Sequence, residues 1–121
     1  MATVINGNLV MDKDMVYNRD LIVKGDILGK NGKRYNLKVN GNITAKNITA
    51  RNINAMGNIN AWNINAWNII ADDINARGIN ANIISYYAVC FAYYYIKCKF
   101  IKGQMKNSKH FVLDGKIEVG K

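Results

Sequence analysis

The hydrophobic positions of residues 42–82 recur at a step of five, with a single step of six where Gly57 is inserted. Isoleucine occupies each of these positions, and alanine follows each isoleucine two residues later. The isoleucines are Ile43, Ile48, Ile53, Ile59, Ile64, Ile69, Ile74 and Ile79. Five residues rotate an α-helix by about 500°, so an apolar stripe with this step would circle the helix. The period therefore excludes a helix.

A five-residue step fits a short β-strand followed by a corner. Because side chains alternate along a strand, the isoleucine and the alanine both point inward, and the residue between them points outward. The other two residues, a variable one and an asparagine, form the corner, because asparagine tolerates left-handed backbone and its amide bonds neighbouring main chain. The pattern predicts a β-solenoid with asparagines stacked in ladders. The predicted core comprises Ile48, Ile53, Ile59, Ile64, Ile69, Ile74, Ala50, Ala55, Ala61 and Ala66.

Looser copies of the repeat lie on both sides of this region. Four segments share the arrangement apolar-x-Gly-x-apolar, namely residues 5–9, 23–27, 39–43 and 113–117. We therefore predict one solenoid domain over the whole chain, with about six coils at ~4.8 Å per coil. Its predicted parts are looser six-residue faces in 1–41 with a loop at 30–35, a tandem five-residue core in 42–84, and an aromatic and basic C-terminal cap in 85–121.

The number of faces per coil follows from the spacing of glycines. Four of them mark corners: Gly7, Gly25, Gly41 and Gly57. Their separations of 18, 16 and 16 residues favour three faces per coil. Four faces would stack Arg51 over Asp72, whereas three would stack Lys46, Trp62 and Arg77 in one column, with cations on both sides of an indole. We favour three sides and keep four as the alternative.

The tandem repeat Asn-Ile-x-Ala-x resembles the repeat of the pentapeptide-repeat proteins, which are right-handed four-sided β-helices. The resemblance implies an all-β fold made of a single right-handed β-helix. The chain departs from the family pattern in one respect, since the family places a small residue two positions before the central apolar one. This chain has larger residues there: Lys46, Arg51, Trp62 and Trp67.

A second resemblance concerns a glycine-containing corner. Residues 41–45, with Val39 before them, are similar to the three-sided solenoid of bactofilins, bacterial proteins that polymerise into cytoskeletal filaments. Bactofilins usually carry flexible proline-containing tails, whereas this chain contains no proline. The two resemblances cover residues 5–84 and concern the shape of the repeat. They carry over no functional residue.

The net charge of the chain indicates the charge of its partner. The chain carries +9, and residues 91–121 hold seven cations against two anions. This balance favours an anionic partner, either nucleic acid or an acidic protein face. The N-terminal residues contain no apolar run long enough for a signal peptide or a membrane span, so we expect a cytoplasmic protein. Cys90 and Cys98 fit that compartment as reduced, structural thiols.

Residues suited to catalysis are few. His110 is the single histidine, and Asp72 and Asp73 fall in a corner, where we expect them to replace asparagine. The sequence contains no nucleophile elbow, no phosphate-binding glycine loop and no cysteine–histidine spacing typical of a metal site. We therefore expect no enzymatic activity, no cofactor and no bound metal.

The variable position of the repeat points outward and is free for recognition. The candidate partner-binding residues are Arg51, Met56, Trp62, Trp67 and Arg77. Tryptophan and arginine are enriched in binding hot spots. Alternatively, each indole lies flat over the neighbouring coil and shields the corner.

Residues 85–96 break the repeat and hold five of the seven tyrosines. Strand alternation predicts Ala88, Cys90, Ala92 and Tyr94 on one side. The other side would present the candidate cap or self-association residues Tyr87, Phe91, Tyr93 and Tyr95. A basic patch follows, made of Lys97, Lys99, Lys102, Lys106 and Lys109. Such a segment would cover the open end of the solenoid, form a two-fold homodimer or bind nucleic acid.

These features support three functional hypotheses. The first is a small non-catalytic binding protein of a phage or mobile element that inhibits a bacterial macromolecular complex, such as nucleic-acid-guided defence of the CRISPR type. The second is a bactofilin-like scaffold that assembles with itself. The third is direct binding of nucleic acid through the basic C-terminal region. None of the three predicts a membrane partner.

Overall fold

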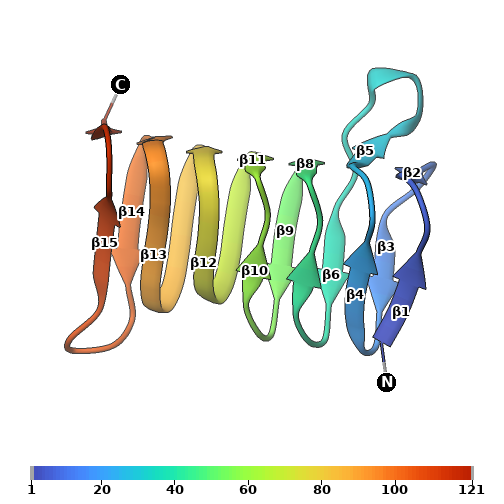
Figure 1. The fold of residues 1–121 in the computed structure, drawn as a ribbon, viewed down its shortest axis with the longest axis horizontal. Helices are drawn as coiled ribbons and strands as arrows, with labels where there is room; N and C mark the ends of the chain where they lie inside the picture. The colour runs from blue at the N-terminus through green and yellow to red at the C-terminus, as the bar shows by residue number, and fades with distance from the viewer. Residues whose placement is uncertain (1, 121) are drawn as a thin grey trace.

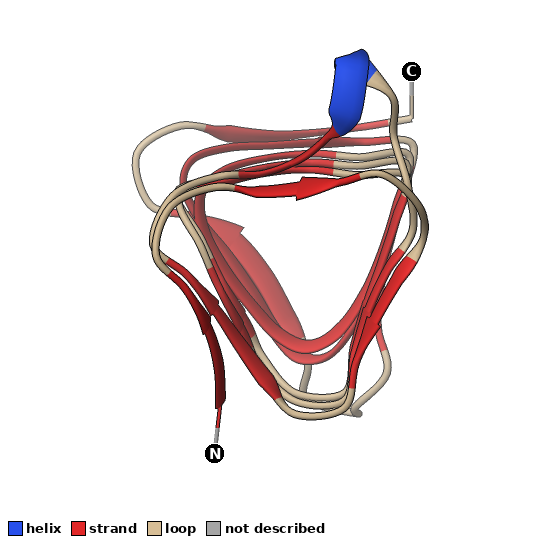
Figure 2. Cartoon of the chain, turned by 90° about the vertical axis from the view of Figure 1, so that its right-hand side faces the viewer, coloured by secondary structure: helices blue, strands red, loops and turns tan. Residues whose placement is uncertain are grey.

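The chain winds around one long axis as a β-solenoid of about seven turns (Figure 1). The computed structural model describes residues 2–120. Seen from the N-terminal end, the cross-section is a triangle, and successive strands run clockwise away from the viewer (Figure 2). The predicted right-handed, three-sided β-helix is therefore confirmed, and the four-sided alternative is wrong. We number the faces in the order in which the chain passes through them, and each corner takes the number of the face before it.

Each face is a parallel sheet whose strands come from successive coils. The first face contains β1 (Ala2–Ile5), β4 (Asp20–Val23), β7 (Ile43–Thr44), β10 (Ile59–Asn60) and β15 (Lys109–Val112). The second contains β2 (Leu9–Met11), β5 (Ile27–Gly29), β8 (Asn47–Thr49), β11 (Asn63–Asn65) and β16 (Lys116–Val119). The third contains β3 (Met15–Tyr17), β6 (Leu37–Val39), β9 (Asn52–Ala55) and β14 (Phe100–Gly103).

Two long strands pass around the corners without a break. β12 (Asn68–Asn80) and β13 (Ile83–Cys98) each run through all three faces. On its N-terminal side β12 pairs with β9, β10 and β11, and on its other side it pairs with β13. β13 pairs in turn with β14, β15 and β16. These two strands therefore join the three faces into one hydrogen-bonded network.

The inward side chains form columns along the axis. On the first face Ile43 pairs with Ile59, and Ile59 pairs with Ile74, so isoleucine stacks on isoleucine. Each isoleucine and alanine of the predicted core is at most 6% exposed. Full burial of one such isoleucine stabilises the fold by about 1.5–3 kcal/mol. The core prediction is confirmed.

Asparagine and aspartate form hydrogen-bonded ladders along the corners. At the third corner the backbone N–H of Asn42 donates to Oδ1 of Asp20, and that of Asn58 donates to Oδ1 of Asn42, each at 2.8 Å. The N–H of Asp73 continues the ladder to Asn58 at 3.2 Å, and the N–H of Val89 donates to Asp73 at 3.0 Å. Asp73 therefore does replace asparagine in a corner, as predicted.

The loop predicted at residues 30–35 leaves the solenoid at the second corner. It contains the 3₁₀ turn η1 (Lys30–Gly32), in which Asn31 and Gly32 have φ values of 57° and 75°. These two residue types tolerate that left-handed backbone. Figure 2 shows the loop projecting beyond the triangle. Arg34 ties it to the second face, because its guanidinium donates to the Ala50 carbonyl and to Oδ1 of Asn65, each at 3.3 Å.

The aromatic segment is not the flat strand that alternation predicted. β13 bends around two corners, and at each of them it has one more residue than β12. The extra residue at the first corner turns Tyr94 outward, where it is 52% exposed, so the prediction that it shares one side of the strand with Cys90 and Ala92 is wrong. Tyr86 points inward instead and is 1% exposed.

Both ends of the solenoid are open within residues 2–120. At one end β1, β2 and β3 pair only with β4, β5 and β6, and at the other β14, β15 and β16 pair only with β13. The outer backbone groups of these strands therefore lack a strand partner. The aromatic segment lies in the wall of the solenoid and continues the coil toward the C-terminus (Figure 1).

Candidate functional site

At the first corner, lysine, tryptophan and arginine from three successive coils lie one above another. The N–H of Trp62 donates to the Lys46 carbonyl at 2.7 Å, and the N–H of Arg77 donates to the Trp62 carbonyl at 2.6 Å. The side chains stack in the same order. Lys46 Nζ lies 5.0 Å from the centroid of the Trp62 ring, and Arg77 Cζ lies 4.6 Å from it. The column predicted for three faces, with cations on both sides of an indole, is confirmed.

The second corner has a related but shorter column. Arg51 Cζ lies 5.1 Å from the centroid of the Trp67 ring, and the N–H of Trp67 donates to the Arg51 carbonyl at 2.7 Å. In the next coil the N–H of Asn82 donates to the Trp67 carbonyl at 2.8 Å. The asparagine brings no cation, so this indole is stacked by a cation from one side.

The two indoles are half-buried, at 42% exposure for Trp62 and 46% for Trp67. The sequence suggested either an exposed binding residue or an indole that shields the corner. Each ring does both, since it packs along the corner and still exposes much of its surface to solvent. Each cation–π contact at such an exposed site stabilises by about 0.5–1 kcal/mol. The contacts therefore fix the positions of the cations more than they stabilise the fold.

The two columns border the same face. Trp62 precedes β11 and Trp67 follows it, so the second face lies between them. Its outward side chains are small and polar, as in the row Thr49, Asn65 and Asn80. We call this surface, with its two corners, the basic face. Its cations include Arg34, Lys46, Arg51, Arg77 and Lys97.

These cations have no carboxylate partner. Within residues 2–120 the one ion pair joins Lys116 and Glu118, at 3.8 Å near the C-terminal end. Asp72 and Asp73 lie at the third corner, opposite the basic face. Asp26 at the first corner and Glu118 beside Lys97 on the second face form no ion pair with these cations, so the basic face keeps a positive net charge.

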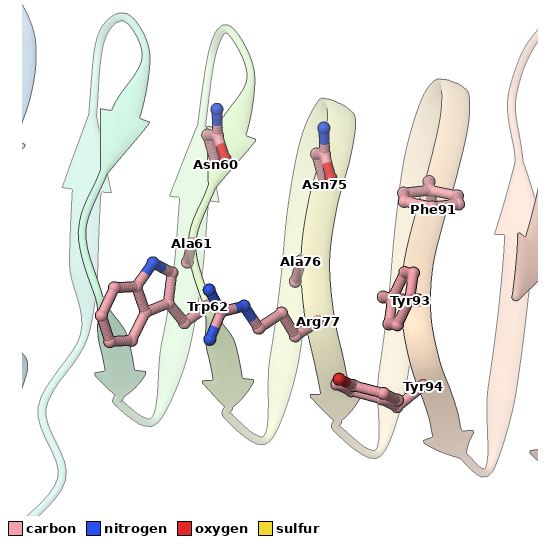
Figure 3. Close-up of a pocket in the computed structure, with 9 residues that line it drawn as sticks. All are labelled: Asn60, Ala61, Trp62, Asn75, Ala76, Arg77, Phe91, Tyr93 and Tyr94. Atoms are coloured by element: carbon pink, nitrogen blue, oxygen red, sulfur yellow. The ribbon is translucent and has the colours of Figure 1, made fainter. Parts of the chain in front are cut away.

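An open groove of about 530 Å³ lies beside the first corner (Figure 3). One of its sides is the corner row Trp62, Arg77 and Tyr94. The other is the row of outward residues on the first face, Asn60, Asn75 and Phe91. Ala61 and Ala76 lie between the rows in two coils and Tyr93 in the third, and the groove runs along the axis across these coils.

The candidate partner-binding residues are thus divided among three corners. Trp62 and Arg77 meet at the first corner and Arg51 and Trp67 at the second. Met56 lies at the third corner, where its N–H donates to the Val39 carbonyl, and its side chain is 65% exposed. Methionine is therefore separate from the two indole columns.

The candidate cap residues do not share one surface. Tyr87 is exposed at the third corner, and Phe91 on the first face packs on Phe111 with ring centroids 4.9 Å apart. Tyr93 meets Tyr94 at the first corner, with centroids 4.5 Å apart. Tyr95 lies on the second face with Lys97 Nζ 5.6 Å from its centroid. Its ring covers Gly78, so a Cβ at that position would push the tyrosine ring aside.

The basic run is also spread around the solenoid. Lys97 is on the second face, Lys99 follows it at the second corner, and Lys102 points outward from the third face. Lys106 lies in the loop after β14, and Lys109 begins β15 on the first face. All five are exposed. They therefore form a ring around the C-terminal coils and not a single patch.

Polar groups also occupy the inward columns of the C-terminal coils, where His110 stays exposed because its coil is the last on the first face. The Tyr86 hydroxyl and His110 Nδ1 are 2.6 Å apart, so His110 is a structural partner in the inward column of the first face. Burial raises the pKa of Tyr86. Burial, with a smaller effect of Cys98, raises the pKa of Cys90 to about 12. Both cysteines are free and buried, and no three histidine, cysteine or acidic residues of residues 2–120 cluster as a metal site.

No family model, curated protein or solved structure matches this chain. The likeness to pentapeptide-repeat proteins and bactofilins therefore remains one of repeat and solenoid shape. No helix in the described part of the chain is long and apolar enough to cross a membrane. What the protein binds has to be inferred from the geometry of its own surface.

Sequence reasoning misses three contributors to this surface. Strand alternation puts Tyr94 on the side of Cys90 and Ala92, because nothing local in the sequence marks the extra residue at its corner. Arg34 was read only as part of a loop, although it reaches Asn65 across the second face. Lys46 could have been included, because three-fold winding already placed it in the column of Trp62.

Proposed function

We propose that the protein is a non-catalytic binding protein that attaches its basic face to an anionic macromolecular partner. The observation that carries this proposal is the stacking of Lys46, Arg51 and Arg77 against indoles, with no carboxylate to neutralise them. A stacked arginine keeps its N–H donors free for a carboxylate or a phosphate. The cations are therefore held in place before the partner arrives.

Rigidity favours this role. Binding costs free energy when flexible side chains become ordered, by about 0.5–1.5 kcal/mol for each long side chain. At the two indole columns part of that ordering is already complete in the free protein. The surrounding face is flat and polar, with Asn65 and Asn80 between the columns. Such a surface suits another large molecule better than a small metabolite.

The biological form of this activity that we propose is inhibition of a bacterial macromolecular complex by a phage or mobile-element protein. Docking of a rigid solenoid would occupy either the nucleic acid of such a complex or an acidic protein surface. In both cases the partner supplies the negative charge that the basic face lacks. No chemical step is needed for such an effect.

Affinity capture from a lysate of the native host tests this proposal. The bait is the whole protein, compared with an Arg51→Ala, Arg77→Ala double variant. An Arg19→Ala variant is the matched control, because Arg19 is exposed and lies away from the basic face. We expect the wild type and the control to retain the same partner and the double variant to lose it. Equal capture by all three proteins would overturn the proposal.

Self-assembly is a second candidate, favoured by the open strand edges at both ends. The two ends differ in charge, since residues 1–29 hold three cations and four anions and residues 91–121 hold seven cations and two anions. Contact between unlike ends is heterologous and produces filaments when it does not close. Sedimentation distinguishes the candidates, because filaments support a scaffold and a small discrete species supports the binding protein.

A further inference from the structure

The first corner carries cations and aromatic rings in alternation. Lys46, Trp62 and Arg77 stack as described, and Tyr94 follows in the next coil (Figure 3). Tyr94 is turned outward by the extra residue of β13, and its ring is held edge-on against Tyr93 at an interplanar angle of 88°. One edge of the groove therefore offers positive charge and exposed tyrosine side by side.

The other edge of the groove offers free carboxamides. Asn60 and Asn75 point outward from the first face at equivalent positions of neighbouring coils. Among residues 2–120 their side chains make no hydrogen bond, in contrast to corner residues such as Asn42 and Asn58. A carboxamide carries both donors and an acceptor, so it can bond the edge of a nucleobase.

We propose that this groove binds a single-stranded segment of nucleic acid. Arg77 and Lys46 would contact phosphates, a base would stack on Tyr94 or Tyr93, and the amide of Asn75 would contact a base edge. Positive grooves with aromatic platforms are the usual solution for single strands. The proposal rests on the proposed function, because the first corner is one border of the basic face, and it names the partner of that border.

Other anionic partners account for fewer of these features. An acidic peptide would satisfy Arg77 but leaves the tyrosine pair and the free amides without a role. A duplex would satisfy the cations, but its base faces are hidden in the stack. The groove extends over two coil steps of ~4.8 Å, or ~10 Å, which is the length of about three stacked bases at 3.4 Å.

The two tryptophans provide a direct test, because they lie at different corners. A Trp67→Phe variant of the full chain retains Trp62 beside the groove as its single indole, and Trp62→Phe retains Trp67 at the second corner. Each is titrated with short oligo(dT) and oligo(U). We expect both oligonucleotides to quench Trp62 at least twofold more than Trp67. Equal quenching of the two indoles, or none, would overturn the assignment to the groove.

Affinity measurements test the named residues. Fluorescence anisotropy of labelled oligo(dT) and oligo(U) is recorded at low and moderate salt with Tyr94→Ala and Arg77→Ala. Loss of a stacking platform should weaken binding by about fivefold or more. Loss of Arg77 should also flatten the dependence of log K on log salt by about one phosphate contact, a slope change of about 0.7.

Matched controls come from the third corner. Tyr87 is 53% exposed and Arg19 is also exposed, and neither lines the groove, so Tyr87→Ala and Arg19→Ala should leave binding unchanged. Circular dichroism establishes that each variant is folded. Oligo(U) and oligo(dU) differ only in the 2′-hydroxyl, so a comparison of these two identifies the sugar that the groove prefers. Equal losses for Tyr94→Ala and Tyr87→Ala would contradict it.

The outcomes also separate this inference from the proposed function. One outcome is that no oligonucleotide binds while capture of the host partner still requires Arg51 and Arg77. The assignment of the groove to nucleic acid is then wrong, and the proposed function as a binding protein is retained. If a duplex binds as tightly as a single strand, or if polyglutamate displaces oligo(dT) while Tyr94→Ala has no effect, the inference falls because charge alone explains binding. If both capture and oligonucleotide binding are absent, both proposals fall.

Discussion

Arg77 and Trp62 lie one coil apart and stack, with the guanidinium carbon 4.6 Å from the centroid of the indole. The same indole is approached by Lys46 from the preceding coil. Stacking of this kind orients the guanidinium without using its hydrogen-bond donors. The corner therefore combines two needs that often conflict, a fixed side chain and an available charge.

Ile64→Asp should unfold the protein. Ile64 is 1% exposed in the inward column of the second face, and an unpaired buried charge costs several kcal/mol, on the order of the whole stability of a domain. Thermal melting followed by circular dichroism measures the effect. Asn80→Asp places the same charge outward on the same face and should melt near the wild type. A wild-type melting curve for Ile64→Asp would contradict the solenoid core.

Trp67→Ala should weaken binding of the host partner by at least ~2 kcal/mol while the fold is retained. The indole is 46% exposed and positions Arg51, so its loss removes contact area and frees the guanidinium. Calorimetric titration with the captured partner gives the change. Met56→Ala, at the third corner, is the control. Unchanged affinity for Trp67→Ala would mean that the indoles only cover corners.

Asn58→Ala should lower the free energy of unfolding by about 1 kcal/mol. Asn58 Oδ1 accepts the N–H of Asp73, and no atom of alanine can replace that acceptor. Asn58→Asp keeps an oxygen at the same place and should be closer to the wild type. Urea denaturation of the three proteins tests the ladder, and equal midpoints for Asn58→Ala and the wild type would show that water replaces the bond at no cost.

Stability should decrease above pH 9 because of Cys90. Burial raises its pKa from an ordinary 9.0 to about 12, so the unfolded thiol ionises first. The stabilisation is complete below pH 9 and is lost as pH rises toward about 12. By pH 10 the loss should be on the order of 1 kcal/mol. Urea midpoints at pH 7 and pH 10 should fall more for the wild type than for Cys90→Ala, and an equal fall would refute the assignment.

If the second candidate function, self-assembly, holds, light scattering should detect self-association that grows with protein concentration and weakens with added salt. The sequence predicts a homodimer through the C-terminal aromatics, whereas the open and oppositely charged ends favour contact between unlike ends. Asp12→Lys removes an exposed anion from the N-terminal coil and should weaken contact between unlike ends. It should leave a C-terminal homodimer intact, and a constant monomer mass would exclude both arrangements.

Much of the fold is predictable because it is determined by short sequence motifs. The three-residue motif Ile-x-Ala indicates which side chains point inward, and the spacing of the glycines indicates the number of faces. The aromatic segment is different, because the position of Tyr94 depends on one extra residue where β13 crosses a corner of β12. The number of residues in that corner of β13 depends on how two coils fit together, and no local sequence pattern predicts it.

The candidate site likewise has one part that the sequence predicts and one part that depends on how the coils fit together. The column of Lys46, Trp62 and Arg77 is predictable, since it requires only three faces and a regular step. The outward positions of Asn60 and Asn75 are predictable as well, since each lies between an isoleucine and an alanine of the repeat. The groove as a whole is not, because it also needs Tyr94 outside the core.

The corner ladders have a direction. Asp20 accepts an N–H from Asn42, Asn42 accepts one from Asn58, and Asn58 accepts one from Asp73, so an earlier coil always supplies the oxygen. Synthesis also proceeds from the N-terminus. Each coil that leaves the ribosome therefore finds its acceptors already in place, and the growing end acts as a template for the next turn. The molecule can fold in the order in which it is made.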